Sequence, residues 1–381
     1  MNATHDSLRV LALEPYYGGS HQAFLDTWVQ ASRHDWTLVT LPARHWKWRM
    51  RGSALWWAEK LADTPAGRFD ILFTCDMTSV ADLRALVPRS LRALPIVCYF
   101  HENQLTYPLS PDDWRDYQYA FTNITSALAA DAVWFNSRAH LDAFGAATAE
   151  LLRQMPESVP AGVGEAMRAR AAVQYPAVAL SSAGAGRRHR PAGSPLRILW
   201  CHRWEFDKNP ETFFAVLSRL AQAGAAFEVV LVGEQFRTAP EAFTQGLAEL
   251  GARVVHAGFV DERSDYEAWL RTSDVVVSTA IQENFGIAVV EAMLAGCVPL
   301  LPQRLSYPEL LPDWAHASGL YTSADDLLKR LYALCTTERA AWPLDPQVLA
   351  AAVAERFEAT RQVPRLDDAL AAVALRGTHP S

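Results

Sequence analysis

The sequence contains no apolar run as long as the ~20 residues that a membrane-spanning helix needs. Its five cysteines are odd in number, and no two of them have the C-x-x-C spacing of a zinc site, so we expect reduced core cysteines in a cytoplasmic protein. The G-x-G-x-x-G pattern of nicotinamide-binding enzymes is absent. Residues Met1 to Ser7 are polar and precede a predicted strand, so we expect neither a signal peptide nor a membrane partner.

The composition that remains is ordinary for a protein that folds in water. Of the 381 residues, 50% are hydrophobic and 20% are charged, and this length is enough for two domains with cores of their own. The net charge of −7 argues against a surface that binds nucleic acid everywhere, but it leaves room for one basic patch.

Short apolar segments alternate with amphipathic segments along the chain. The predicted strands of the first half are Leu8–Leu13, Trp36–Leu41, Phe69–Thr74, Pro95–Phe100 and Asp131–Asn136. Those of the second half are Leu196–Cys201, Phe227–Val232, Arg253–Ala257, Asp274–Thr279 and Val298–Leu301. Continuous apolar strands separated by helices are typical of parallel sheets covered on both faces. We therefore predict an α/β protein with two doubly wound, Rossmann-like domains and a ligand between the carboxyl ends of their strands.

Composition also predicts the domain boundaries. Residues 181–195 are rich in Gly, Ser, Pro and Arg, which is typical of a flexible linker. This segment separates an N-terminal domain (residues 1–180) from a C-terminal domain (residues 196–345). A helical tail (residues 346–381) follows, and we expect it to pack back across the domain junction.

The most informative segment runs from residue 278 to 292 and predicts a strand, a polar turn and a helix. Asn284 is the expected N-cap of this helix. The next three residues would then turn their backbone N–H groups outward at a positive helix end, which suits a phosphate. These residues are Phe285, Gly286 and Ile287.

Two carboxylates flank this predicted phosphate site. Glu283 precedes the helix, and Glu291 lies about two turns into it, with a side chain that can lean back toward the helix N-terminus. Carboxylates can accept hydrogen bonds from sugar hydroxyls, while the backbone amides hold the negative charge of the phosphate. The two carboxylates therefore suit a phosphorylated sugar. The alternative is an ordinary strand–loop–helix unit with Glu283 in solvent and Glu291 on an exposed face.

Other strand ends carry residues that suit the same ligand. The Gly18–Gly19 turn lets the backbone approach a ligand closely, although a plain turn explains it equally well. Arg203 and Lys208 could neutralise a diphosphate, and the alternative for Arg203 is a structural ion pair with Glu205 or Asp207. A seat for a nucleobase is predicted at two further strand ends, which carry Gly233 with Glu234 and Phe259 with Val260.

The fourth predicted strand delivers His101, Asn103 and Gln104 to the same edge of the first sheet. A single histidine is more often structural than catalytic, but this one stands beside a polar triplet and faces the predicted cleft. We therefore predict a function for His101 and contacts to the acceptor for Asn103 and Gln104.

Cations alternate with indoles in one part of the first domain. Between Arg33 and Arg51 there are five Arg or Lys residues and one Asp, in a chain that is acidic overall. Cations that bind phosphates and rings that stack on bases suit a single-stranded RNA. The predicted contacts are Arg44, Trp46, Lys47, Trp48, Arg49 and Arg51. The alternative is a solvated edge whose tryptophans belong to the core.

Taken together, these residues resemble the GT-B fold and the family 4 retaining glycosyltransferases. The spacing Glu283-x7-Glu291 is similar to the acidic pair of that family, and Arg203 with Lys208 is similar to its basic pair. Four more specific motifs resemble the tRNA-queuosine α-mannosyltransferase family over nearly the whole chain. They are Tyr16-Tyr17-Gly18-Gly19-Ser20-His21, Leu41-Pro42-Ala43 with Trp46-Lys47-Trp48-Arg49, Phe100-His101-Glu102-Asn103-Gln104-Leu105 with Tyr107-Pro108, and His202-Arg203-Trp204-Glu205 with Asp207-Lys208.

The resemblance implies transfer of mannose from GDP-mannose to queuosine in the anticodon loop of the tRNA for aspartate. It implies that Glu291 holds ribose hydroxyls, that Glu283 holds hydroxyls of the donor sugar, and that His101 contacts this sugar near the reacting carbon. No D-x-D triplet occurs, so we expect no metal and no other cofactor. The expected partners are tRNA and a nucleotide-sugar, and we expect a monomer.

Three other functions stay open from the residues alone. A family 4 hexosyltransferase could use a GDP- or UDP-sugar on a glycan or lipid acceptor, although such an acceptor gives no reason for the basic, Trp-rich patch. A non-catalytic tRNA-binding protein would have no need of both the acidic and the basic pair. A sugar-nucleotide epimerase would share the architecture, and the patch again argues against it.

Overall fold

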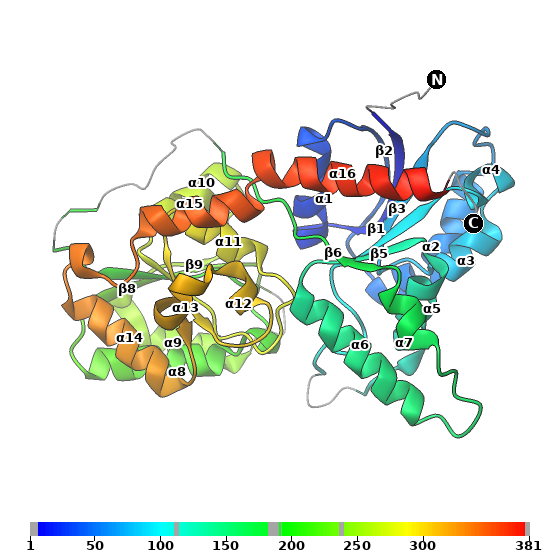
Figure 1. Cartoon of the computed structure of the whole chain (residues 1–381). Coiled ribbons are helices and arrows are strands. Elements are labelled where there is room, and N and C mark those ends of the chain that lie inside the picture. Colours follow the sequence, from blue (N-terminus) through cyan, green and yellow to red (C-terminus); the bar gives the residue numbers. More distant parts are fainter. Residues whose placement is uncertain (1–6, 110–113, 182–189, 192, 236–239, 378–381) are drawn as a thin grey trace. The chain divides into compact units, whose positions relative to one another are not determined.

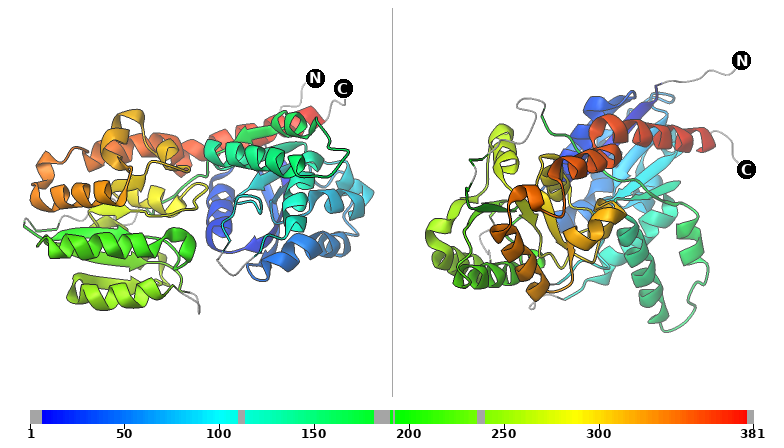
Figure 2. Two further views of the ribbon diagram at one scale, coloured as in Figure 1. Left: turned by 90° about the horizontal axis from the view of Figure 1, so that it is seen from below. Right: turned by 60° about the vertical axis from the view of Figure 1, so that its left-hand side comes forward.

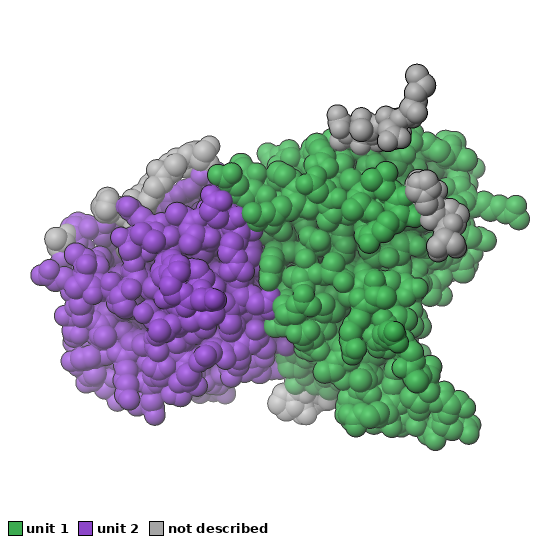
Figure 3. Space-filling view, viewed as in Figure 1, with its two compact units in different colours: residues 1–177, 359–381 green, residues 178–358 purple. Residues whose placement is uncertain are grey.

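The computed structural model describes residues 7–109, 114–181, 190–191, 193–235 and 240–377. The chain divides into two compact units, which Figure 3 shows in different colours. Unit 1 comprises residues 1–177 and 359–381, and unit 2 comprises residues 178–358. The chain therefore passes into unit 2 after Ala177 and returns to unit 1 at Ala359.

Unit 1 contains a six-stranded sheet with the order β2-β1-β3-β4-β5-β6, in which all pairings are parallel (Figure 1). Its strands are β1 (Arg9–Tyr17), β2 (Asp35–Pro42), β3 (Ile71–Cys75), β4 (Ile96–Phe100), β5 (Ala132–Phe135) and β6 (Ala171–Val173). Its helices are α1 (Gly19–Ala31), α2 (Trp46–Lys60), α3 (Val80–Leu86), α4 (Arg89–Arg92), α5 (Tyr117–Ala129), α6 (Arg138–Arg153), α7 (Val163–Arg168) and α16 (Ala359–Gly377).

Unit 2 contains a second six-stranded parallel sheet with the order β12-β11-β10-β7-β8-β9. Its strands are β7 (Leu196–Trp200), β8 (Phe227–Val232), β9 (Val254–Gly258), β10 (Val275–Val277), β11 (Val298–Pro302) and β12 (Leu320–Tyr321). Its α-helices are α8 (Pro210–Gln222), α9 (Glu241–Leu250), α10 (Arg263–Thr272), α11 (Ile287–Leu294), α12 (Tyr307–Leu310), α13 (Asp313–Gly319), α14 (Ala324–Thr336) and α15 (Pro346–Phe357). Its 3-10 turns are η1 (Phe206–Lys208), η2 (Gly251–Arg253) and η3 (Arg339–Ala341).

Helices cover both faces of each sheet, and this explains the apolar strands. In unit 2, α8 packs against α9 and α14 on one face, while α11 packs against α15 on the other (Figure 2). Every residue of the central strands β3, β4, β10 and β11 is buried, whereas the edge strands β2 and β9 are partly exposed. The predicted α/β fold with two doubly wound sheets is confirmed, and all ten predicted strands are present.

Two short edge strands were missed by the sequence prediction. They are β6, with three residues, and β12, with two. Segments this short carry no periodicity that distinguishes a strand from a loop. No helix among the described residues is long and apolar enough to cross a membrane. All five cysteines are free, and only Cys335 is not fully buried.

The described residues of the predicted linker, which are 181, 190–191 and 193–195, belong to unit 2. Ser181 bonds to Glu267 through its backbone N–H (3.0 Å) and its hydroxyl (2.6 Å). Arg190 pairs with Glu228 (2.8 Å) and Asp274 (3.3 Å). Because the carboxylates of Glu267 and Asp274 are buried, their partners are held in place. Residues 182–189 and 192, on which the prediction of flexibility falls, lie outside the described residues.

The predicted tail, residues 346–381, divides between the two units. Helix α15 belongs to unit 2, and α16 belongs to unit 1, where it packs along α1 (Figure 1). Asp367 of α16 is buried and accepts hydrogen bonds from Trp28 Nε1 (2.8 Å), Ser32 Oγ (2.8 Å) and the backbone N–H of Arg33 (2.9 Å). One carboxylate thus anchors α16 to the end of α1.

Asp367→Ala should lower the free energy of unfolding of unit 1 by about 2–3 kcal/mol, because the buried indole N–H of Trp28 loses its acceptor. The adjacent Asp368 provides a matched control, because its side chain is 73% exposed and pairs with Arg33 at the surface. Asp368→Ala should change the free energy by about 0.5 kcal/mol or less. Denaturant unfolding measures both values, and equal effects would show that the anchor is not the buried carboxylate.

Candidate active site

Each sheet has a point at which its strand order reverses, and ligands of doubly wound folds bind beside the carboxyl ends of strands there. In unit 1 this point lies between β1 and β3, and in unit 2 it lies between β7 and β10. The segments that follow these strands are residues 18–21 and 76–79 in unit 1, and residues 201–208 and 278–286 in unit 2. Eight of the predicted site residues lie in these four segments; they are Gly18, Gly19, Arg203, Lys208, Glu283, Asn284, Phe285 and Gly286.

Lys208 occupies the centre of the unit 2 site. Its Nζ lies 2.7 Å from the carbonyl oxygen of Gln282, 3.2 Å from Asp207 Oδ2 and 3.4 Å from Glu283 Oε2. The ammonium group is buried, and the Asp207 carboxylate beneath it is completely buried. Lys208 therefore ties the loop after β7 to the loop after β10 and holds Glu283 beside it.

Arg203 forms the ion pairs that were the alternative to a phosphate contact. Its Nε lies 2.6 Å from Glu205 Oε2, and its Nη2 lies 3.6 Å from Asp207 Oδ2. The side chain remains partly exposed, so the guanidinium can still reach a ligand at this edge. Its role in binding a diphosphate stays a prediction.

The helix predicted from residue 285 begins two residues later. Helix α11 starts at Ile287, and its N-cap is Gly286, whose φ of 100° lies in the left-handed region that a glycine adopts without strain. The prediction of Asn284 as N-cap is therefore wrong, and among the described residues no side chain caps α11. The Phe285 side chain is buried against Phe357, so it anchors the turn and is not open to a ligand.

Glu291 is buried and already has protein partners. Its Oε1 lies 2.6 Å from Arg263 Nη2, and its Oε2 accepts a hydrogen bond from Tyr266 Oη (2.8 Å). Burial raises the pKa of the Glu291 carboxyl, and the contacts to Arg263 and Tyr266 oppose this rise. Each carboxylate oxygen can accept a second hydrogen bond, so a role toward ribose hydroxyls stays a prediction.

The strand ends predicted to seat a nucleobase lie side by side. The backbone N–H of Gly233 donates to the carbonyl of Gly258 (3.2 Å), directly before Phe259, and the N–H of Trp204 donates to Glu234 (2.9 Å). A Cβ at residue 233 would lie 1.9 Å from the carbonyl oxygen of His202, so only glycine fits there. Phe259 is exposed and Val260 is partly exposed.

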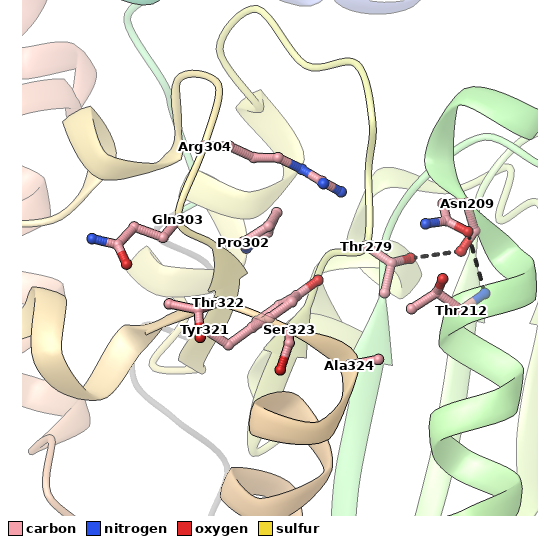
Figure 4. A pocket seen from close by; sticks show the side chains of 10 residues that line it. All are labelled: Asn209, Thr212, Thr279, Pro302, Gln303, Arg304, Tyr321, Thr322, Ser323 and Ala324. Atoms are coloured by element: carbon pink, nitrogen blue, oxygen red, sulfur yellow. Dashed lines mark hydrogen bonds between the residues drawn. The ribbon is translucent and has the colours of Figure 1, made fainter.

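A cavity of about 300 Å³ lies in unit 2 beside the loops that follow β7 and β10 (Figure 4). Residues that line it include Asn209, Thr279, Arg304, Tyr321 and Ser323. The Thr279 hydroxyl bonds to the carbonyl oxygens of Lys208 (2.8 Å) and Asn209 (3.0 Å), so the wall of the cavity also supports Lys208.

The unit 1 site is a buried cluster of acids and imidazoles, only one of which, His101, was a predicted site residue. Glu14 Oε1 lies 3.4 Å from His21 Nδ1, and the rings of His21 and His101 are 3.9 Å apart. Asp76 Oδ1 accepts the backbone N–H of His101 (2.8 Å). Sequence reasoning missed Glu14 and Asp76 because they come from separate strands. Glu14 lies in the last half of β1 and Asp76 directly follows β3, near the edge of the sheet where ligands of such folds bind.

Burial and charge give the two imidazoles opposite properties. Burial lowers the pKa of His21, but the charge and hydrogen bond of Glu14, with smaller effects of Asp76 and Glu102, raise it to about 9. Burial and the positive charge of His21 hold the pKa of His101 well below its usual value. Burial raises the pKa of the Asp76 carboxyl to about 8 against the effect of His21.

Glu14, His21 and Cys75 each place one potential ligand atom within 4.8 Å of the others, and among the described residues no further group of this kind occurs. Glu14 Oε1 already accepts the N–H of Tyr16 (2.8 Å) and the thiol of Cys75 (3.3 Å). The contacts therefore fit a hydrogen-bonded carboxylate, and we assign no metal to this group.

The two glycines and two amides predicted for this edge have different surroundings. Gly18 is packed so that a Cβ would lie 2.5 Å from the Cβ of Ala43, and Gly19 has a φ of 54° at the start of α1. The side chain of Asn103 is buried, and it bonds to Leu105, Thr106 and His140. The predicted RNA contact of Asn103 is therefore corrected to a loop-forming role, while Gln104 remains partly exposed.

The predicted basic, aromatic patch lies on the first turns of α2. Arg44, Lys47, Trp48 and Arg51 are exposed. Trp46 is partly buried against Met50 and Cys75, so the core alternative holds for this one indole. Arg49 is also partly buried and bonds to the carbonyl of Pro42 (3.3 Å).

Helix α5 extends this patch with residues that sequence reasoning missed. Tyr119 packs on Trp46 with ring centres 5.1 Å apart, and Arg51 lies 5.2 Å from the Tyr119 ring centre. Tyr117 on the same helix and Trp114 before it are exposed. We call the exposed residues of both segments the α2–α5 surface; they are Arg44, Lys47, Trp48, Arg51, Trp114 and Tyr117. The aromatic spacing from 114 to 119 was the available signal for the second segment.

The two units match two known families. Residues 9–178 match the family described as tRNA-queuosine alpha-mannosyltransferase N-terminal, and residues 187–336 match glycosyl transferases group 1. A Drosophila melanogaster protein named tRNA-queuosine alpha-mannosyltransferase is 34% identical over 368 residues, which are 94% of this chain and 95% of that protein.

A second relative matches a smaller part. The GDP-mannose-dependent alpha-(1-6)-phosphatidylinositol dimannoside mannosyltransferase of Mycobacterium tuberculosis is 23% identical over 126 residues, which are 33% of this chain and 32% of that protein.

Solved structures share the fold. Anabaena HepE, in complex with UDP and glucose, is 15% identical, and the match covers 96% of this chain and all of that chain with a TM-score of 0.67. The N-terminal domain of the Candida albicans trehalose-6-phosphate phosphatase is 10% identical over 96% and 97% of the two chains, with a TM-score of 0.68. The chain is therefore a glycosyltransferase with the GT-B fold, and it belongs to the tRNA-queuosine alpha-mannosyltransferase family.

Proposed function

We propose that this enzyme transfers mannose from GDP-mannose to queuosine in the anticodon loop of the tRNA for aspartate. The single observation that carries the proposal is the full-length likeness to the Drosophila tRNA-queuosine alpha-mannosyltransferase. The donor rests on the group 1 match of unit 2 and on a GDP-mannose-dependent relative of part of the chain.

On the donor side, the diphosphate would bind at the uncapped N-terminus of α11, beside Arg203 and Lys208. Backbone N–H groups and the two cations would stabilise the negative charge that grows as the bond from mannose to phosphate breaks. Glu283, held by Lys208, would accept hydrogen bonds from the sugar, Glu291 would accept them from the ribose, and the exposed Phe259 would pack on the base. His101 would hydrogen-bond to a hydroxyl of mannose.

On the acceptor side, the α2–α5 surface supports an RNA loop. Its cations can contact phosphates, and its exposed rings can stack on unpaired bases. Trp46, Tyr16 and Cys75 pack in one hydrophobic cluster, so this surface adjoins the carboxyl ends of β1 and β3. An anticodon loop bound there would lie next to the strand ends that carry Glu14 and Asp76.

Trp48→Ala should weaken tRNA binding by about 1–3 kcal/mol, the value of one base stacked on an aromatic ring. Arg51→Ala should weaken binding and reduce the slope of log K against log salt by about one. Filter binding of tRNA at several salt concentrations measures both changes.

Trp314 on unit 2 is the matched control, because its side chain is 52% exposed, close to the 60% of Trp48. Trp314→Ala should leave tRNA binding unchanged. If all three variants bind tRNA as the unaltered protein does, the acceptor surface lies elsewhere.

We also propose that transfer requires no metal, since the sequence has no D-x-D triplet and two cations flank the proposed diphosphate site. Chelation with EDTA should leave the rate unchanged, and a loss restored by added Mg²⁺ or Mn²⁺ would contradict this proposal.

The decisive experiment is incubation with GDP-mannose and queuosine-bearing tRNA, followed by mass spectrometry of the nucleosides. The expected result is a gain of one hexose on queuosine that is absent when the tRNA lacks queuosine. Parallel reactions with UDP-glucose, and with phosphatidylinositol mannosides as acceptors, test the lipid alternative suggested by the mycobacterial relative. Transfer only to the lipid would overturn the tRNA proposal.

A further inference from the structure

Glu14 and His21 form a buried ion pair that lies directly against the ring of His101. The pair spans β1 and α1, with Glu14 Oε1 3.4 Å from His21 Nδ1. The His21 ring stacks on the His101 ring with centres 3.9 Å apart and planes inclined by 31°. Glu14 Oε1 is itself held by the N–H of Tyr16 and the thiol of Cys75, so the carboxylate cannot turn away without breaking these bonds.

Only one of the two stacked rings can carry a charge. Two positive rings at this distance would repel each other strongly in a buried site. The ion pair with Glu14 gives the charge to His21, which leaves His101 neutral. The low pKa of His101 agrees with this assignment.

The other described groups near His101 that can be named do not reverse this assignment. Asp76, after β3, accepts the backbone N–H of His101 and not a proton of its ring. Glu102 follows His101 in the same loop, and its charge also favours the protonated form of His21. His140 of α6 is held neutral by burial, with its pKa lowered to about 3, and Phe24 of α1 meets the His101 ring edge-on.

We propose that the Glu14–His21 ion pair keeps the imidazole of His101 neutral and fixes its plane, so that Glu14 and His21 are positioning residues for glycosyl transfer. The role in transfer rests on the proposed function. A neutral imidazole has one donor and one acceptor nitrogen, so it can both give a hydrogen bond to a sugar hydroxyl and receive one. An imidazolium can only donate. The ion pair thus selects the form of His101 that can orient a hydroxyl in either sense.

The pH dependence follows from the two pKa shifts. The pKa of His21 is raised from 6.5 to about 9, so the stability that the ion pair contributes is complete below pH 6.5 and is lost as the pH rises through about 9. The pKa of His101 is lowered, so its contribution is complete above pH 6.5 and is lost on acidification. Between pH 6.5 and about pH 9 the site therefore contains a charged His21 and a neutral His101.

The test is an NMR titration of the full chain with ¹⁵N-labelled histidine, because it reports ring protonation without any need for turnover. In the unaltered protein we expect His21 to stay protonated up to about pH 9 and His101 to be neutral across the neutral range. This measurement requires no variant that has to fold. A neutral His21 or a protonated His101 at pH 7 would overturn the inference.

Glu14→Gln then removes the charge while it keeps an oxygen for Tyr16 and Cys75. The His21 midpoint should fall by at least two pH units. His101 stays neutral at pH 8 with or without the ion pair, so transfer at this pH should slow by about tenfold or more because the plane of its ring is no longer fixed, and the alkaline limb of the rate profile should move in the same direction. His21→Gln removes the positive charge of the same ion pair, so its rate of transfer should be similar to that of Glu14→Gln. Cys75→Ser is the matched control, since it touches the same Glu14 oxygen without changing a charge, and it should leave the His21 midpoint in place.

The outcomes separate this inference from the proposed function. If the titration and the Glu14→Gln shift are as expected but the rate profile does not move, the positioning role is wrong. If the unaltered protein transfers no mannose to tRNA, the proposed function fails, and the same rate profile measured with the donor and acceptor that do react decides the positioning role.

Discussion

Lys208→Ala should destabilise unit 2 by about 3–5 kcal/mol and reduce glycosyl transfer below detection, because it leaves the completely buried carboxylate of Asp207 without its main counter-charge. The variant also removes the bond to the carbonyl of Gln282 and the ion pair that holds Glu283. Denaturant unfolding and single-turnover kinetics give the two losses separately.

A charge-neutral double variant distinguishes the structural contribution of Lys208 from its proposed contact with a diphosphate. In Asp207→Asn with Lys208→Met, the buried charge and its partner disappear together, so much of the lost stability should return. Transfer should stay undetectable, since no cation replaces the ammonium group. Recovery of both stability and transfer would show that Lys208 acts only through folding.

Arg203→Ala should lower kcat/KM by a factor of roughly 30 to 1,000, which corresponds to a loss of about 2–4 kcal/mol in transition-state binding. The stability of the protein should change little. Its ion pair with Glu205 is partly exposed, and such pairs contribute about 1 kcal/mol or less. Its contact with Asp207 is long, at 3.6 Å, and Lys208 lies closer to this carboxylate, at 3.2 Å. The variant therefore tests the diphosphate contact almost alone. Steady-state kinetics and a thermal melt measure the two quantities.

Arg219 supplies the comparison for Arg203. It is an exposed arginine of α8 in unit 2 that pairs with the exposed Asp325 (2.7 Å). Arg219→Ala should change neither kcat/KM nor stability appreciably. If Arg203→Ala behaves as Arg219→Ala does, Arg203 has no part in transfer beyond its ion pairs with Glu205 and Asp207.

The fold was predictable because its sheets are covered on both faces, so that every central strand is a continuous apolar run. The strands β6 and β12 escaped prediction because two or three residues carry no pattern, and their place at the sheet edge depends on pairing alone. The sequence also could not show that Ser181 and Arg190 are held in unit 2, because their partners Glu267 and Asp274 are distant in the chain.

The meeting of the Lys208 and Glu283 loops was predictable from the sequence, whereas the start of the helix that follows was not. The loops of Lys208 and Glu283 do meet, since both follow strands at one reversal of sheet order. The helix start was misplaced because Asn284 is a favoured N-cap residue, whereas the turn requires the left-handed backbone of Gly286. The preference of Asn for N-cap positions and the conformational freedom of Gly do not by themselves show which of the two residues will begin the helix.

The acidic and imidazole cluster of unit 1 was the least predictable part. Glu14, His21, Asp76 and His101 come from four separate segments, and each has an ordinary structural explanation when it is considered singly. Their chemistry appears only when the parallel strands bring their ends together. Asn103 shows the reverse. Its side chain looked available to a ligand, but its oxygen accepts hydrogen bonds from the backbone of its own loop.

The return of the chain to unit 1 at Ala359 sets an order of events during synthesis. Unit 2 is complete in sequence before the ribosome has made α16, so it can finish folding first. Until Asp367 emerges, the indole N–H of Trp28 lacks its acceptor and the surface of α1 lacks its cover. Synthesis of unit 1 thus begins first and is completed last. The surface of α1 that α16 covers in the folded protein stays exposed on the nascent chain until α16 has been made.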